Sequence, residues 1–322
     1  MQRKSEFATA DAPSGRVRSL LLAGLALALG VPTLGWSAAA PPLRMCAESN
    51  NMPFSDRRGE GFENQIAALV ARRLGRQLQY VWLRPDVDLA ALQPALSACD
   101  AVIAEPKPTP GMDTTVPYYW SSYVLLTRAD RHLQMDSLKD PHLKKLRIGV
   151  EAIGRRGLFT PPAHVLMEAG LADHLIPFDI GAPGTAPNGT GSQQNPRAAI
   201  VQALARGQID VAAVWGPAVG RLAQQSPVPL RVALITDGDA FSTRKDHFGL
   251  QSMQFQISMG VRHGDDALRR ALSAVIEQNR PEIERVLERF GVPLINPVSF
   301  NGENLAHSGV GIVGGGRRRP GA

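Results

Sequence analysis

The chain has 322 residues, of which 44% are apolar and 20% are charged, as in an ordinary soluble globular protein. This length supports one large domain or two smaller ones. Its formal net charge is +6, and residues 1–40 (four basic, two acidic) and 298–322 (three basic, one acidic) each supply +2, which leaves +2 for residues 41–297. A near-neutral middle segment offers no basic footprint for nucleic acid, so we expect no nucleic-acid partner.

The first 40 residues have the pattern of an export signal. Four basic residues within the first 18 precede an uncharged apolar run, Leu20–Trp36, and small residues follow at Ser37–Ala40. The alternative is a retained membrane anchor, but Gly30, Pro32 and Gly35 interrupt the run before it reaches the roughly 20 residues that a spanning helix needs. We therefore predict a cleaved signal peptide over residues 1–40 and an exported mature protein that is not embedded in a membrane.

The next segment alternates between strand and helix patterns. Leu43–Glu48 is predicted as a buried strand, and apolar residues at 3.6-residue spacing after Gly61 predict a helix. A strand at Gln77–Leu83, a short helix over residues 89–97 and a strand at Cys99–Glu105 follow. The β-α-β-α-β order predicts a parallel sheet.

The two cysteines, Cys46 and Cys99, fall on strands that can be neighbours in this sheet. An oxidising compartment permits a disulfide between them. The alternative is two buried free thiols, because a parallel register can hold the two positions too far apart to bridge. We favour the disulfide.

After an extended aromatic segment, Val116–Arg131, the alternation of strands and helices starts again. The chain then closes with two helices, Asp265–Gln278 and Pro281–Phe290. A Gly/Pro/Ser/Thr-rich stretch over residues 181–196 is predicted as a long loop, and the Gly-rich tail from residue 298 as disordered. The repeated elements begin with a strand followed by a loop over residues 145–154. The further strands are 175–180, 208–216, 230–236 and 254–262, and the helices are 162–170, 195–207 and 217–225.

Several stretches resemble the type 2 periplasmic solute-binding fold in its amino-acid-binding branch. They are "NNMPFSDRRGEGFENQIAALVARRLGRQLQYVW", "VPYYWSSYVLLTRAD", "LKDPHLKKLRIGVEAIG" and "ALARGQIDVAAVWGP". The resemblance implies an α/β protein of two lobes, with parallel-rich sheets, helices on both faces and a hinge of two segments. Lobe 1 would comprise residues 41–128 and 236–297, and lobe 2 residues 129–235.

Other stretches, among them "CAESNNMPFSDRRGEGFEN", "PYYWSSYVLLTRADR" and "NPRAAIVQALARGQIDVAAVWGP", are similar to one subgroup. These are the MoxJ/XoxJ-like substrate-binding proteins associated with quinoprotein dehydrogenases. The resemblance implies a periplasmic, non-catalytic protein of methylotrophy, working beside a PQQ-dependent alcohol dehydrogenase of the methanol type and its cytochrome c. It implies no cofactor of the chain's own.

Ligands of parallel α/β sheets bind at the carboxyl ends of the strands, which here would border the cleft between the lobes. Aromatic walls with a few oriented polar groups suit a small ligand, whereas the alternative for the aromatic residues is a place in the core. The basic turn after residue 153 attracts an anion or is simply solvated. The candidate cleft residues are Asn50, Asn51, Phe54, Ser55, Arg57, Glu105, Tyr118, Tyr119, Ser121, Ser122, Glu151, Gly154, Arg155 and Trp215.

Two departures from the amino-acid binders concern charge. Those proteins carry an arginine for the ligand's carboxylate, where this chain has Gly111 and Met112. They also end a strand of lobe 2 in an aspartate for the ammonium group, where this chain has Trp215 and Gly216. A free amino acid would leave its charges unpaired in the cleft, which is costly, so we expect another ligand or none.

Two other functions compete with the accessory role. One is the substrate-binding component of an ABC importer for a small organic solute. The other is a dehydratase-like enzyme in which Glu105 and Glu151 serve as acid and base across the cleft. The sequence has no nucleophile motif, and its seven histidines are scattered without metal-ligand spacing, so we expect neither catalysis nor a metal site.

Overall fold

The structure is a computed structural model that describes residues 40–83, 97–106, 111–153, 158–180, 197–236, 252–295 and 310–313. Within these ranges twelve strands form one continuous mixed sheet, and a two-stranded hairpin, β2 (Asn50–Asn51) with β3 (Ser55–Asp56), stands apart from it. The predicted signal peptide, the 181–196 loop and most of the 89–97 helix lie outside these ranges. No helix in the described part of the chain is long and apolar enough to cross a membrane.

One half of the sheet, called lobe 1 below, contains the predicted parallel strands. β1 (Leu43–Glu48) lies between β4 (Leu78–Leu83) and β5 (Ala101–Pro106) and is parallel to both, as expected. β13 (Gln254–Arg262) runs antiparallel beside β5 and also pairs with the short β6 (Met112–Thr114). The β-α-β-α-β prediction is therefore confirmed in its strands.

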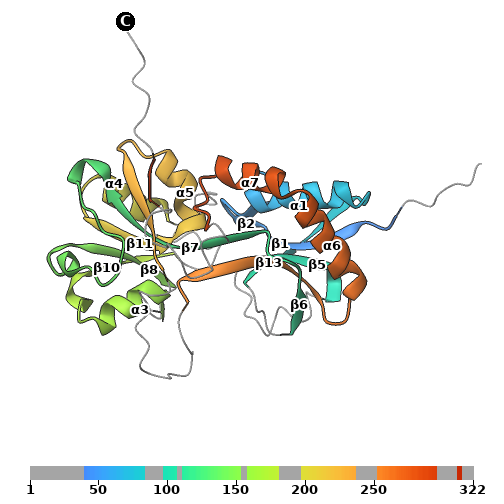
Figure 1. Cartoon of the computed structure of the whole chain (residues 1–322), viewed down its shortest axis with the longest axis horizontal. Coiled ribbons are helices and arrows are strands. Elements are labelled where there is room, and N and C mark those ends of the chain that lie inside the picture. Colours follow the sequence, from blue (N-terminus) through green and yellow to red (C-terminus); the bar gives the residue numbers. More distant parts are fainter. Residues whose placement is uncertain are drawn as a thin grey trace, which may run out of the picture. The chain divides into compact units, whose positions relative to one another are not determined.

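Three helices cover one face of lobe 1 (Figure 1). They are α1 (Phe62–Arg73), α6 (Asp266–Gln278) and α7 (Arg280–Arg289), and the last two match the predicted closing helices. Their apolar stripes enclose one core with the sheet, in which Phe62 contacts Phe290 with ring centroids 5.7 Å apart. Burial of such stripes stabilises these helices more than their intrinsic propensity does.

The start of α1 depends on a close approach of the chain to itself. The Asn64 side-chain oxygen accepts hydrogen bonds from the N–H groups of Asp56, at 2.9 Å, and Gly61, at 3.2 Å. A Cβ atom at Gly61 would lie 2.0 Å from the carbonyl oxygen of Phe54. Only glycine fits there, so the sequence "GEGF" serves this packing of the β2–β3 hairpin against the helix.

The other half of the sheet, called lobe 2, has the order β10-β8-β11-β7-β12. Its strands are β8 (Ile148–Ile153), β9 (Leu158–Phe159), β10 (Leu175–Asp179), β11 (Val211–Trp215) and β12 (Leu230–Leu234). Alternate residues of β11 face opposite cores: Val211 and Ala213 pack under α3 (Pro161–Glu168), and Ala212 and Val214 under α4 (Ala198–Ala205) and α5 (Gly216–Gln224). Figure 1 shows α3 on the side opposite α4 and α5. Short 3-10 helices connect the elements at Ala129–Arg131, Pro141–Lys145 and Ala172–His174.

A single strand, β7 (Tyr119–Arg128), belongs to both lobes. Its residues Tyr119–Ser122 pair with β13, whereas Tyr123–Thr127 pair with β11 and the stretch 124–128 pairs with β12 on the other side. The hydrogen-bonding partners thus change between Ser122 and Tyr123. The aromatic segment predicted to cross between the lobes is therefore one strand that pairs in both halves of the sheet.

The tail provides one correction. Residues from 298 on were predicted as disordered, yet Val310–Val313 forms strand β14, antiparallel to β12. The physical reason is that β12 would otherwise present a row of unpaired backbone groups at the edge of lobe 2, which a short extended segment can satisfy.

The predicted disulfide is confirmed between Cys46 and Cys99, whose Cα atoms lie 5.6 Å apart. The register of β1 and β5 pairs Cys46 with Val102, so Cys99 reaches the bridge from the turn before β5. Both cysteines are buried against Val102. The bridge ties the first strand of lobe 1 to the third segment of its parallel sheet.

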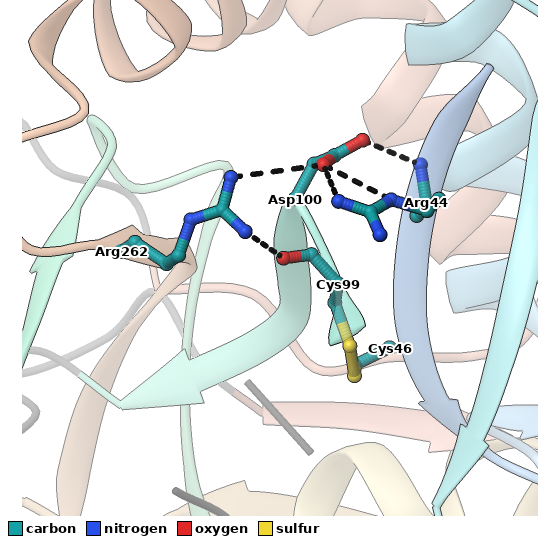
Figure 2. The surroundings of a disulfide bond; sticks show 5 residues. All are labelled: Arg44, Cys46, Cys99, Asp100 and Arg262. Carbon is teal, nitrogen blue, oxygen red and sulfur yellow. Dashed lines mark hydrogen bonds and ion pairs between the residues drawn. A yellow bond between two sulfur atoms is a disulfide. The ribbon is translucent and has the colours of Figure 1, made fainter. Parts of the chain in front are cut away.

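Beside the disulfide, the Asp100 carboxylate forms ion pairs with arginines from three separate segments. Figure 2 shows Arg44 and Arg262 reaching it from different sides, and the Arg262 guanidinium also donates to the Cys99 carbonyl at 3.0 Å. Arg76 makes a further ion pair at 3.2 Å. Burial alone would raise the pKa of Asp100, but the hydrogen bonds and charge of Arg44, with help from Arg76, lower it overall.

Candidate functional site

A cavity of about 400 Å³ lies where strands of both lobes end, at the edge predicted from the strand order. Most of its wall is apolar or aromatic, with three carboxylates and one arginine among the described residues. The wall residues are Cys46, Ala47, Glu48, Asn51, Phe54, Glu63, Leu83, Val102, Ile103, Ala104, Tyr119, Tyr123, Glu151, Ile153, Thr160, Ile180, Arg197, Trp215, Phe255 and Ile257.

Glu151 of β8 is the most buried charged residue of this wall, with 0% of its surface exposed. One of its oxygens accepts a hydrogen bond from the Arg197 guanidinium, whose side chain is 13% exposed. The other oxygen accepts from the backbone N–H of Trp215, at 3.1 Å. A buried carboxylate is tolerated only when it is paired in this way, so Glu151 and Arg197 largely neutralise one another.

Three separate segments of lobe 2 bring Glu151, Arg197 and the Trp215 N–H together. β8 delivers Glu151 at its carboxyl end, and Arg197 stands directly before α4. Trp215 is the last residue of β11 and directly precedes α5, and its backbone N–H donates to Glu151. The backbone N–H of Trp215 is thus already engaged by Glu151 and is not left for a ligand.

Aromatic rings form one side of the cavity at the crossing between the lobes. The Trp215 ring lies 5.2 Å from that of Tyr123 and 5.5 Å from that of Phe255, centroid to centroid, with the edge-to-face tilt that aromatic pairs favour. These three residues come from β11, β7 and β13. They make a rigid apolar surface at the hinge strands.

The two wall tyrosines are held in their protonated form. Burial raises the pKa of Tyr123, the charge of Glu151 adds to the rise, and Arg197 partly opposes it. Burial also raises the pKa of Tyr119 well above its usual range, with a further contribution from Glu63. Neither phenol can act as a base near neutral pH; both are suited to donate hydrogen bonds.

Five of the predicted cleft residues line the cavity: Asn51, Phe54, Tyr119, Glu151 and Trp215. Gly154, Arg155 and the side chain of Glu105 lie outside the described residues. The predicted anion site and the predicted pair of carboxylates across the cleft therefore stay predictions.

Three predicted cleft serines do not line the cavity, because their hydroxyls contact backbone carbonyls of other segments. The Ser55 hydroxyl donates to the Glu48 carbonyl at 2.8 Å, and the Ser121 hydroxyl to the Pro293 carbonyl at 2.6 Å. The Ser122 hydroxyl lies against the carbonyls of Ile235 and Met253.

Tyr118 is buried in the core of lobe 1, which is the alternative noted for the aromatic residues.

The last two members of the set lie near the rim of lobe 1. Asn50 pairs with Asp56 in the β2–β3 hairpin, and the Arg57 guanidinium lies over the Trp82 ring, 5.6 Å from its centroid. Neither belongs to the described cavity wall. Gly111 and Met112, where the resemblance led us to look for an arginine, border a different cavity of about 280 Å³ beside Cys99 and Arg262.

Sequence reasoning missed several wall residues, chiefly Glu48, Glu63, Arg197 and Phe255. Glu48 ends the first strand, so the rule that selected Glu105 would also have selected it. Glu63 is only 5% exposed although it stands in the polar first turn of α1. Nothing in the sequence around Arg197 distinguishes it from a solvated helix-start arginine.

The arrangement leaves Glu151 without a free oxygen for acid–base chemistry. Both oxygens of Glu151 are engaged, and the described residues contain no group of histidine, cysteine, aspartate or glutamate side chains that could hold a metal ion. We assign no cofactor to the wall. What remains is a mostly apolar and aromatic hollow that also contains Glu48 and Glu63, and its one described arginine is paired with Glu151.

Comparisons with known proteins agree with this fold. The model of the bacterial extracellular solute-binding proteins, family 3, matches residues 43–291. Protein MoxJ of Methylorubrum extorquens is 34% identical over 262 residues, covering 81% of this chain and 83% of that protein. The crystal structure of MxaJ from Methlophaga aminisulfidivorans MPT superimposes with a TM-score of 0.64 at 27% identity, covering 79% of this chain and all of that one. For periplasmic binding protein XoxJ from Methylobacterium extorquens AM1, the TM-score is 0.56 at 34% identity, covering 79% of this chain and 99% of that one.

Proposed function

We propose a function on the premise that this chain belongs to the bacterial extracellular solute-binding proteins, family 3. It is a periplasmic binding protein that serves as a non-catalytic accessory of a PQQ-dependent alcohol dehydrogenase. Its similarity to proteins named MoxJ, MxaJ and XoxJ supports the choice of partner, through the subgroup that the sequence resembles. The dehydrogenase's cytochrome c is the second partner to test.

The observation that carries the proposal is the internal pairing of Glu151 with Arg197 and with the Trp215 N–H. In a binder of charged solutes, such groups would be left for the ligand. Here they satisfy one another, and the surface left for a partner is mostly aromatic and apolar, with Glu48 and Glu63 as its other charged residues. Buried aromatic anchors carry much of the energy of protein interfaces, so this wall suits a side chain or loop of another protein.

The test is binding of the mature chain to the purified dehydrogenase, apo and PQQ-loaded, by titration calorimetry. We expect saturable binding to at least one form, and Trp215→Ala to weaken it at least tenfold, about 1.4 kcal/mol. This variant keeps the backbone N–H that Glu151 needs. Ile176→Ala is the matched control, since Ile176 is an exposed apolar residue outside the cavity wall. Absence of binding to both forms would refute the proposal.

A second candidate is the substrate-binding component of an ABC importer. The observation in its favour is the cavity itself, because 400 Å³ is within the usual range for small-molecule sites. A thermal-shift screen against alcohols, organic acids, amino acids and PQQ decides the matter. A ligand at 100 times its Kd should stabilise the fold by roughly 2.7 kcal/mol, and a screen without any shift counts against an importer role.

A further inference from the structure

Strand β12 is held between two very different neighbours. On one side it pairs over its full length, Leu230–Leu234, with the long strand β7. On the other side it pairs with β14, in the register Leu230↔Val313, Arg231↔Ile312, Val232↔Gly311 and Ala233↔Val310. β14 pairs with β12 alone among the described strands, so it is the edge of this sheet.

β14 joins lobe 2 through its backbone pairing with β12. Among its residues, Val313 packs against the core under α4 and α5, beside Val232 and Leu234. In β12, Leu230 is buried in this same core and Ala233 is buried in the core on the opposite face of the sheet. The pairing of the two strands is a hydrogen-bonded ladder, which another extended peptide can also form.

Gly311 makes the segment a weak occupant of this edge. A Cβ atom there would meet no atom within 4 Å, and Gly311 is not among the glycines with positive φ. Neither space nor backbone conformation requires glycine at this position. Glycine inside a strand is less favourable than alanine because it loses more conformational freedom on folding. Gly311 therefore weakens the pairing of β14 with β12, although a larger residue would fit at this position.

The edge is also uncharged. Arg231 is the charged residue of β12, but it is 7% exposed, and its guanidinium is bonded to the Met135 carbonyl at 2.6 Å and to Asp136. An occupant of this edge therefore meets backbone donors and acceptors and apolar side chains, without a charge to neutralise. The fitting segment is extended, uncharged and free of proline.

We propose that the outer edge of β12 is a strand-acceptor site for an extended, uncharged segment of a partner protein, and that Val310–Val313 is the occupant that this segment displaces. The chain's own tail covers the edge of β12 in the absence of a partner, so that the exposed edge is only the four-residue strand β14. Because the tail is tethered, it competes at an effective concentration in the millimolar range, and a partner strand must pair better than "VGIV" to replace it. This surface is separate from the cavity, so the inference does not rest on the proposed function.

The test uses the mature full chain and a fluorescein-labelled peptide of residues 308–316, "SGVGIVGGG". In the variant Val310→Pro/Gly311→Pro the tail cannot pair, because neighbouring N–H groups point to opposite sides and one of the two lost donors faces β12. We expect fluorescence anisotropy to show saturable binding to this variant, and binding at least tenfold weaker to the unchanged chain. Gly311→Ala strengthens the tail and should weaken peptide binding a further two- to fivefold, roughly as the glycine penalty in strands predicts.

Two controls separate strand pairing from other causes. A peptide carrying the same two prolines should not bind the variant, and circular dichroism of the variant should match that of the unchanged chain. Val232→Cys/Gly311→Cys, which joins residues paired across the two strands, should abolish binding once oxidised. The proposal is overturned if the folded proline variant binds no peptide, or if the proline-containing peptide binds equally well.

Discussion

Removing Arg197 tests whether the cavity wall depends on its internal ion pair. In Arg197→Met the side-chain volume is roughly kept, but Glu151, with 0% exposure, loses its cationic partner and retains the Trp215 N–H. Breaking a buried pair by removing one partner costs about 3–5 kcal/mol. Because Arg197 is 13% exposed and one hydrogen bond to Glu151 survives, we expect the lower end, about 3 kcal/mol of unfolding free energy.

The assay is urea unfolding of the mature chain at neutral pH, with Glu151→Gln and the double variant Arg197→Met/Glu151→Gln completing a cycle. The double variant should recover at least 1 kcal/mol relative to Arg197→Met, because it removes the uncompensated charge as well. The refuting result is an Arg197→Met variant within about 0.5 kcal/mol of the unchanged chain, the usual range for surface substitutions. Glu151 would then be solvated and not buried beside the cavity.

Three further changes probe lobe 1. Cys46→Ser/Cys99→Ser removes a bridge between residues 53 apart, for which loop entropy predicts a loss of about 4 kcal/mol in urea unfolding; a loss below about 1 kcal/mol would mean that the bridge does not restrain the unfolded chain. The lowered pKa of Asp100 gives stability that is full above its unfolded pKa near 3.8 and is lost as pH falls through the lower folded value. The stability gap between the unchanged chain and Asp100→Asn should therefore shrink in acid unfolding series below about pH 4, and a pH-independent gap contradicts the ion-pair account. Gly61→Ala, which sets a Cβ 2.0 Å from the Phe54 carbonyl, should cost about 1–3 kcal/mol, and an unchanged Tm would show that the hairpin can move away.

Much of the fold was predictable because its signals are local. The strand at Leu43–Glu48, the helix after Gly61 and the two closing helices each show their own periodicity, and their order indicates parallel strands. The disulfide was predicted from two cysteines placed on neighbouring strands of a chain expected to be exported. Each of these inferences needed only residues close in sequence, or a single topological rule.

The cavity wall was less predictable because it is set by side-chain direction and long-range pairing. Ser121 and Ser122 lie in the predicted crossing strand, yet their hydroxyls turn toward backbone carbonyls of segments more than 100 residues away. Arg197 could be recognised as part of the wall only once β8 and α4 were neighbours. The pairing of the tail strand with β12 likewise depends on an edge that exists only in the folded sheet.

The sharing of β7 between both halves of the sheet limits how this protein can be divided. A gene fragment encoding residues 129–235, which the sequence suggests as a self-contained lobe, would lack the strand that lies between β11 and β12. Both remaining strands would then expose unpaired edges, and such a fragment should aggregate. A fragment that keeps all the β7 residues paired with β11 and β12 has to begin at Tyr123. A cut at that point divides β7 and leaves lobe 1 with only its first residues, Tyr119–Ser122. Recombination between relatives would therefore preserve the fold only where the exchanged pieces keep β7 whole.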